Sequence, residues 1–142
     1  MIYKSVFKSF YLCAIIVGCL ACSHSTQPIE LTILHTNDTH SQVEPLEQGK
    51  RDELRGGYAR RMGLIEQIRQ QNPNLIVLDA GDFCQGSPYF NFYKGRIEIE
   101  AMNRMQYDAI TLGNHEFDNG VDTLAMILKM ADFPIVCSNY DV

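Results

Sequence analysis

The sequence predicts an α/β fold with a mostly parallel sheet. Short apolar runs rich in β-branched residues alternate with longer segments whose apolar residues recur at helical spacing, in the order β-α-β-α-β-α-β. The second run, at 75–78, is apolar throughout, which is typical of a strand buried on both faces. A polar motif follows each of the first three runs. Because strands joined by helices run parallel, these motifs are expected at one edge of the sheet.

The elements can be placed in order along the chain. Strands are expected at 31–34, 75–78, 109–112 and 133–137, and a polar stretch at 41–56 is expected to be a long surface loop. Three helices are expected between the strands, and their apolar stripes are Tyr58, Met62, Ile65 and Ile68, then Ile97, Ala101, Met102 and Met105, and last Leu124, Ile127, Leu128 and Ala131. The first helix should end before Asn72-Pro73, and Glu98 and Glu100 should face solvent on the second.

Size and charge narrow the classes of function. A length of 142 residues suits one domain or part of a larger protein. A net charge of −5 argues against a general nucleic-acid binder, which would carry a basic stripe. An acidic protein that holds an anionic phosphate needs a local source of positive charge. Bound divalent ions would supply it.

The N-terminus is expected to direct export. Residues 1–22 have a basic start followed by an apolar stretch at 10–22, too short to cross a bilayer as a helix. The stretch ends in a lipobox-like sequence, so lipidation is expected at Cys22, with Cys19 as the alternative. The protein would then be anchored by lipid in the cell envelope or periplasm. A cleaved signal peptide without a lipid is the other possibility.

The remaining chain divides into a tether and a folded domain. Residues 23–29 are expected to form a polar tether, and residues 30–142 the domain. Its two cysteines, Cys84 and Cys137, are expected to be free.

The motifs after the strands offer ligands for metal ions. Asp38 and His40 leave a strand end on the same side, because alternate residues of an extended chain point the same way. Asp82 is placed to bridge two ions, and Asn114 offers a neutral oxygen. Two ions in such a site clamp a phosphate and lower the pKa of a bound water.

His115 follows Asn114 and has a different expected use. It could protonate a leaving group, and Asp118 could fix its tautomer and raise its basicity.

Each motif also has an ordinary interpretation. Asp-x-His can be surface polarity, Gly-Asp is a common turn, and Asn114-His115 could cap a helix that begins near Asn119. Asp118 or Asn119 would be a suitable N-cap residue there. His35, inside the first strand, is expected to be a buried histidine and not a ligand. The joint pattern of three motifs at three strand ends favours the metal site.

Three segments carry a family resemblance: ILHTNDTHS at 33–41, GDFCQGS at 81–87 and GNHEFD at 113–118. They resemble the calcineurin-like metallophosphoesterase superfamily and, within it, the bacterial 5′-nucleotidase and UDP-sugar hydrolase family. The resemblance implies a four-layer α/β/β/α domain, with this chain as its N-terminal part, that hydrolyses phosphate esters of nucleotides.

The resemblance also implies roles for the site residues. Asp38 and His40 would bind the first of two divalent ions of zinc, manganese or cobalt type, Asp82 would bridge them, and Asn114 would bind the second. His115 and Asp118 would form the catalytic pair.

The sequence departs from the family pattern in its later motifs. Family members add a lone histidine and a Gly-His-x-His motif, whereas this chain has four histidines and none after Asp118. The domain at 30–142 is therefore expected to be incomplete at its C-terminal end, with little turnover by this chain. The alternatives are a non-catalytic or fragmentary envelope protein that retains the fold and a 2′,3′-cyclic-nucleotide phosphodiesterase of the same superfamily.

Overall fold

The computed structural model describes residues 28–47 and 55–139 of the 142-residue chain. The predicted signal peptide at 1–22, with Cys22, lies outside these residues, as does the tether up to residue 27. The described residues from Leu31 onward belong to one compact unit.

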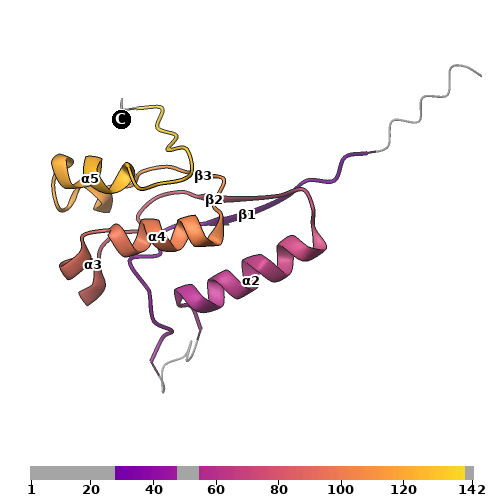
Figure 1. Ribbon diagram of the computed structural model, residues 1–142, viewed down its shortest axis with the longest axis horizontal. Helices are drawn as coiled ribbons and strands as arrows, with labels where there is room; N and C mark the ends of the chain where they lie inside the picture. The colour runs from indigo at the N-terminus through magenta and orange to yellow at the C-terminus, as the bar shows by residue number, and fades with distance from the viewer. Residues whose placement is uncertain (1–27, 48–54, 140–142) are drawn as a thin grey trace, which may run out of the picture. The chain divides into compact units, whose positions relative to one another are not determined.

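A parallel sheet forms the centre of this unit, as the alternation of elements predicted. Strands β1 (Thr32–Thr36), β2 (Leu75–Asp79) and β3 (Ala109–Ile110) pair in the order β1-β2-β3. Figure 1 shows the strands side by side with the helices around them. The predicted α/β class with a parallel sheet is confirmed.

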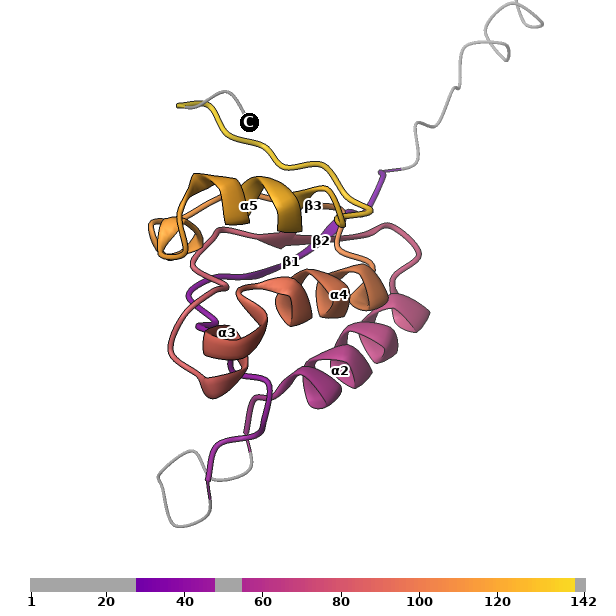
Figure 2. The same ribbon diagram turned by 60° about the vertical axis from the view of Figure 1, so that its left-hand side comes forward.

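The three predicted helices are present. They are α2 (Tyr58–Gln71), α4 (Arg96–Met105) and α5 (Val121–Leu128). The end of α2 follows the prediction: Asn72 closes the last turn with a side-chain hydrogen bond from Nδ2 to the carbonyl of Ile68, at 2.9 Å, and Pro73 follows. Figure 2 shows α2 and α4 on the same side of the strands.

Two short helical segments were not predicted. Helix α3 (Pro88–Tyr93) begins after Ser87, whose hydroxyl accepts a hydrogen bond from the Phe90 amide, with proline at the first turn. Serine at the N-cap followed by proline is a recognised helix start, so the sequence contained this information. The 3-10 turn η1 (His115–Phe117) lies within the third polar motif.

The third and fourth strands are shorter than predicted. β3 covers only two residues of the expected 109–112, because the neighbouring strand β2 ends at Asp79 and leaves no partner beyond Ile110. The expected strand at 133–137 is reduced to one bridge between Ile110 and Ile135. Pro134 lacks an N–H, so the ladder cannot extend through it on that side.

One face of the sheet is buried, and the other is partly exposed in the described structure, most of all at β1. Leu34, Val77 and Ile110 belong to the same hydrophobic core as Ile65 of α2 and Ile99 of α4. On the opposite face Ile33 is 57% exposed, and His35 is exposed as well. The expectation of a buried His35 was wrong, because the alternation of the strand points it away from the core.

Glu98 was also placed wrongly. It was expected on the solvated face of its helix, but it is fully buried with Ile99 and Met102 on the inner face of α4. Burial raises the pKa of its carboxyl. A single charged residue inside an apolar stripe cannot be recognised from spacing alone.

The described residues contain one sheet, and the second sheet of a four-layer domain is not among them. No helix within 28–47 and 55–139 has the length and apolar character needed to cross a membrane.

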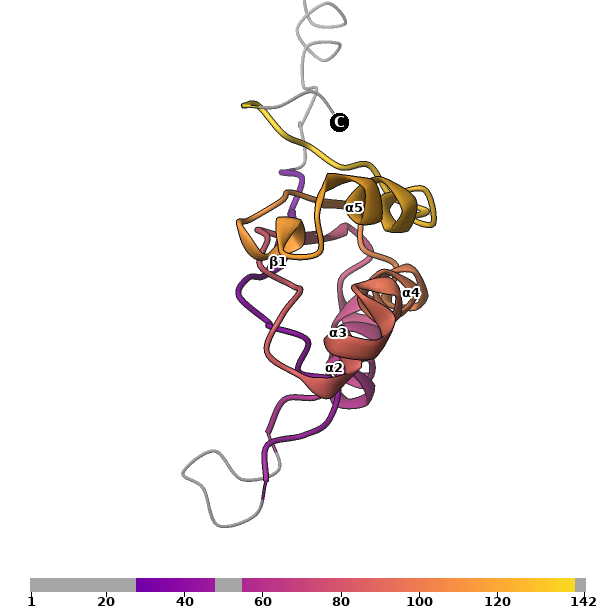
Figure 3. The same cartoon turned by 90° about the vertical axis from the view of Figure 1, so that its left-hand side faces the viewer.

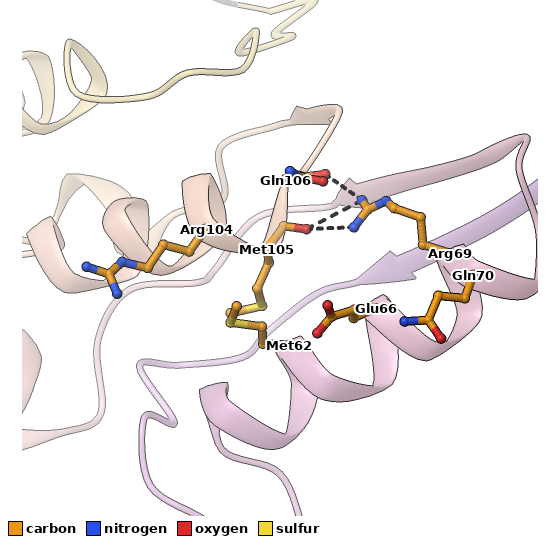
Figure 4. A pocket seen from close by; sticks show the side chains of 7 residues that line it. All are labelled: Met62, Glu66, Arg69, Gln70, Arg104, Met105 and Gln106. Atoms are coloured by element: carbon orange, nitrogen blue, oxygen red, sulfur yellow. Dashed lines mark hydrogen bonds between the residues drawn. The ribbon is translucent and has the colours of Figure 1, made fainter.

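A hollow of about 460 Å³ lies between the C-terminal ends of α2 and α4 (Figure 4). Arg69 reaches across it and donates hydrogen bonds to the carbonyls of Met105 and Gln106, at 3.3 and 2.9 Å. These bonds satisfy carbonyls at the end of α4, so Arg69 joins the two helices. The hollow lies where β2 and β3 begin, away from the polar motifs at the strands' carboxyl ends.

Candidate metal centre

Three loops leave the carboxyl ends of the strands: the first loop at 37–41, the second at 80–87 and the third at 111–120. They lie at the end of the unit where α3 is found, which faces the viewer in Figure 3. The first two loops continue the parallel pairing of β1 and β2. The Asp38 amide donates to the Gly81 carbonyl at 3.0 Å, and the His40 amide donates to the Asp82 carbonyl at 3.1 Å. Main-chain bonds therefore bring the first two motifs together.

The backbone is unusual at the predicted ligands. Asp38, His40 and Asp82 have φ values of 50°, 43° and 51°, and Ser41 has 49°. Residues other than glycine rarely adopt this left-handed region, and those held there are concentrated at functional sites. The loops therefore direct these side chains at some cost in backbone energy.

The structure brings together three of the predicted site residues, one from each loop. His40, Asp82 and His115 offer ligand atoms that all lie within 4.8 Å of one another. The two imidazole rings meet edge to face, with centroids 5.1 Å apart. Two imidazole nitrogens and a carboxylate oxygen suit zinc and similar divalent ions. The donor set fits a metal ion.

His40 is oriented by one residue of the second loop and one of its own loop. Its Nδ1 lies 3.2 Å from Oε1 of Gln85, and its Nε2 lies 3.6 Å from Oδ1 of Asp38. If Nδ1 donates to Gln85, Nε2 keeps the lone pair needed to bind a metal. The pKa of the exposed Asp38 carboxyl is lowered, first by its hydrogen bond from Asn37.

His115 is paired with Asp118, as the spacing suggested. Nδ1 of His115 lies 2.8 Å from Oδ2 of Asp118, and this bond is the main cause of a raised pKa of His115. The bond leaves Nε2 available to face the cluster. A carboxylate that orients an imidazole in this way fits both a metal ligand and a proton donor.

Asn114 is exposed and lies directly before His115 in the third loop. It precedes η1 without a capping hydrogen bond from its side chain. The alternative that Asp118 or Asn119 caps the following helix was wrong, because the N-cap residue of α5 is Gly120. The side-chain amide oxygen of Asn114 therefore remains available as a ligand.

Sequence reasoning assigned no role to two residues that join these loops, Gln85 and Glu116. Gln85 has a φ of 80° and contacts His40. Glu116 is 3% exposed and accepts hydrogen bonds from main-chain amides of two loops. The GNHE motif contains Glu116, but its sequence gives no sign that this side chain points inward.

Cys84 and Cys137 are free, as predicted. Cys84, in the second loop, is fully buried, and burial raises the pKa of its thiol. A buried thiol with a raised pKa is a poor nucleophile, which agrees with a packing role.

The fold and the cluster define a class of protein: a parallel α/β domain with a divalent-metal site at the carboxyl edge of its sheet. Comparison with known proteins gives the family. The profile described as "Calcineurin-like phosphoesterase" matches residues 31–136. The chain belongs to the calcineurin-like phosphoesterase family.

Proteins named 5′-nucleotidase are similar in sequence to this chain. A snake venom 5′-nucleotidase from Crotalus adamanteus is 47% identical over 129 residues, which are 85% of this chain and 21% of that protein. The human 5′-nucleotidase is 47% identical over 116 residues, 78% of this chain and 20% of that protein. This chain therefore spans about a fifth of the length of these relatives.

Solved structures of nucleotidases are similar to this chain as well. The 5′-nucleotidase precursor from Thermus thermophilus matches with a TM-score of 0.73 and 46% identity, over 78% of this chain and 22% of that one. The NAD nucleotidase of Haemophilus influenzae matches with a TM-score of 0.71 and 34% identity, over 78% and 21% of the two chains.

Proposed function

We propose that this chain supplies three ligand-bearing loops of a metal-dependent phosphoesterase that hydrolyses phosphate esters of nucleotides, in the manner of a 5′-nucleotidase. The observation that supports it most is the cluster of His40, Asp82 and His115, which come from three separate loops. The 5′-nucleotidase names of its relatives support the nucleotide substrate.

The proposed centre would hold two divalent ions of zinc, manganese or cobalt type. Asp38 and His40 would hold the first ion, Asp82 would be shared by both, and Asn114 would hold the second. The nearness of Asp38 to His40, at 3.6 Å, supports the first pair. Such ions would provide positive charge for the phosphate and activate a water molecule.

His115 and Asp118 have a separate part in the proposed reaction. Nδ1 of the imidazole is held by Asp118, which leaves Nε2 free, and a ring nitrogen of His115 lies within 4.8 Å of ligand atoms of His40 and Asp82. In the protonated form it stabilises the charge that develops on the phosphate or gives its proton to the leaving group. Asp118 keeps the tautomer and the orientation that this needs.

Cobalt titration of the 142-residue chain tests the metal centre. We expect bound Co²⁺ to give d–d absorption. Asp82→Asn should lower the cobalt affinity at least about 10-fold, because the variant removes an anionic ligand. Asp122→Asn, a change at an exposed position of α5, is the matched control. Equal cobalt affinity in both variants would refute the role of Asp82.

Phosphate release from 5′-AMP with added manganese tests the reaction. This chain has no histidine after Asp118, so we expect weak binding of the second ion and little or no turnover. Robust metal-dependent release would contradict that expectation. Nucleotide binding without hydrolysis by a longer form of the protein would favour the non-catalytic alternative, and selective cleavage of a 2′,3′-cyclic nucleotide would favour the phosphodiesterase.

A further inference from the structure

Glu116 is the acidic residue of the third loop that the proposed reaction does not use. Its side chain is buried and points between the second and third loops. Oε2 accepts hydrogen bonds from the amides of Asp82, at 3.0 Å, and Gly113, at 2.6 Å. Oε1 accepts one from the amide of Cys84, at 3.0 Å. One carboxylate therefore binds three main-chain N–H groups.

These three main-chain amides depend on Glu116 for a hydrogen-bond acceptor. Within the described residues, none of them donates to a main-chain carbonyl. A buried amide without an acceptor is costly, and bonds to a carboxylate are stronger than bonds to a neutral oxygen. Glu116 thus replaces the main-chain partners that the second loop loses where it leaves the sheet.

The bonds form a closed path through the cluster. Glu116 holds the amide of Asp82, and Oδ1 of Asp82 accepts a hydrogen bond from the amide of His115, at 3.0 Å. His115 is the residue before Glu116 in the chain. The path fixes Asp82 at its main chain and its side chain, although its φ of 51° is unfavourable. A strained conformation persists only where its surroundings hold it in this way.

Glu116 does not itself have the position of a metal ligand. Both of its oxygens already accept amide hydrogens, and its side chain is 3% exposed. The exposed acids of these loops, Asp38 and Asp118, lie outside this path.

We propose that Glu116 is a positioning residue, which ties the second loop to the third so that the proposed ligand Asp82 and the proposed proton donor His115 are held in place before a metal arrives. The inference deepens the proposed function and rests on it for the role of Asp82. Its structural part, the tie between the loops, can be tested without metal.

The first test uses the metal-free 142-residue chain. Through-hydrogen-bond NMR correlations are expected between the Glu116 carboxyl carbon and the amides of Asp82, Cys84 and Gly113. These amides should also exchange slowly with solvent. The absence of all three correlations together with fast exchange would overturn the inference, whether or not the chain binds metal.

The second test compares Glu116→Gln with the wild type. Glutamine keeps one acceptor oxygen but turns an NH₂ group toward a donor amide, so at least one of the three bonds is lost. Exchange at Asp82, Cys84 and Gly113 should accelerate selectively, while Val77 in the sheet stays protected. Glu66→Gln, at an exposed position of α2, is the matched control.

The same variants are then titrated with Co²⁺. Loss of a residue that orients ligands typically lowers metal affinity by roughly 10–100-fold, and we expect Glu116→Gln to do so in the folded protein with an altered d–d spectrum. Unchanged exchange, affinity and spectrum in a folded Glu116→Gln variant would overturn the inference. If the wild type binds no cobalt, the proposed metal centre fails, and the amide measurements still decide whether Glu116 ties the loops. If Glu116→Gln does not fold, the wild-type correlations decide.

Discussion

Gly113 lies directly against Asp82. A Cβ atom at Gly113 would be 2.7 Å from the Asp82 amide nitrogen and nearer still to its carboxylate oxygen Oδ1. Gly81 makes the approach as close from the other side, since a Cβ there would be 2.5 Å from the Gly113 nitrogen. The second and third loops therefore meet at main-chain distance, which only glycine permits at these positions.

Gly113→Ala is expected to displace the Asp82 carboxylate. Overpacking of this kind costs about 1–3 kcal/mol in stability, and we expect cobalt affinity to fall at least about 10-fold because a ligand moves. Cobalt titration and chemical denaturation measure the two effects. Gly63→Ala, in the middle of α2 with nothing within 4 Å, is the control and should stabilise the chain by up to about 1 kcal/mol. A Gly113→Ala protein with unchanged cobalt affinity would contradict the close approach.

Asp118→Asn is expected to lower the pKa of His115. The hydrogen bond from His115 to the Asp118 carboxylate is the main cause of the raised pKa, and a neutral amide stabilises the imidazolium less. An NMR titration of the His115 ring protons in the metal-free chain measures the change. The exposed Asp122→Asn variant should leave the pKa of His115 unchanged. An unchanged pKa of His115 in Asp118→Asn would show that Asp118 does not cause the raised pKa.

Asp79 should make stability depend on pH. Burial raises the pKa of this carboxyl from 3.8 to about 6, although Thr36 and the Gly81 amide donate hydrogen bonds to it. Between these pH values the folded state holds a proton that the unfolded state has lost. The contribution of Asp79 to the free energy of unfolding therefore falls as pH rises from about 4 to about 6, by at most about 3 kcal/mol.

Asp79→Asn should remove this dependence. Oδ1 of asparagine can still accept from the Gly81 amide, and Nδ2 can donate to the Thr36 hydroxyl. We expect the variant to gain stability relative to the wild type between about pH 4 and pH 7 in denaturant titrations, whereas Asp132→Asn, at an exposed position, should not. If the free energies of unfolding of the wild type and Asp79→Asn differ by the same amount at about pH 4 and at about pH 7, the raised pKa of Asp79 is refuted.

Cys22→Ser is expected to abolish a lipid anchor. When the chain is produced in a bacterium with labelled fatty acid, the wild type should carry the label and partition into detergent, since a thiol at the lipobox is the acylated group. Cys19→Ser should keep the label. Label retained in Cys22→Ser and lost in Cys19→Ser would move the site to Cys19, and no label in the wild type would favour a simply cleaved signal peptide.

Local pattern in the amino-acid sequence was enough to predict the fold class and the order of the site motifs. Strand and helix periodicities differ enough that the runs at 31–34 and 75–78 predicted β1 and β2 to within two residues at their ends, and the apolar stripes predicted α2 and α4. The parallel connection then required Asp38, Asp82 and His115 to lie at the same edge of the sheet. Local pattern failed where a strand is defined by its partner: the expected strand at 133–137 needed a longer β3 beside it.

The direction of several side chains, and what they hold, depends on the packing of the folded chain. Glu98 and Glu116 cannot be told from ordinary surface residues in the sequence, yet both are buried, whereas His35 was expected to be buried and is exposed. Burial of a charged group depends on partners far away in the chain, such as the amides of Asp82 and Cys84 that bind Glu116. The candidate ligands could therefore be found in the sequence, whereas the way they are held follows from contacts between loops that are distant along the chain.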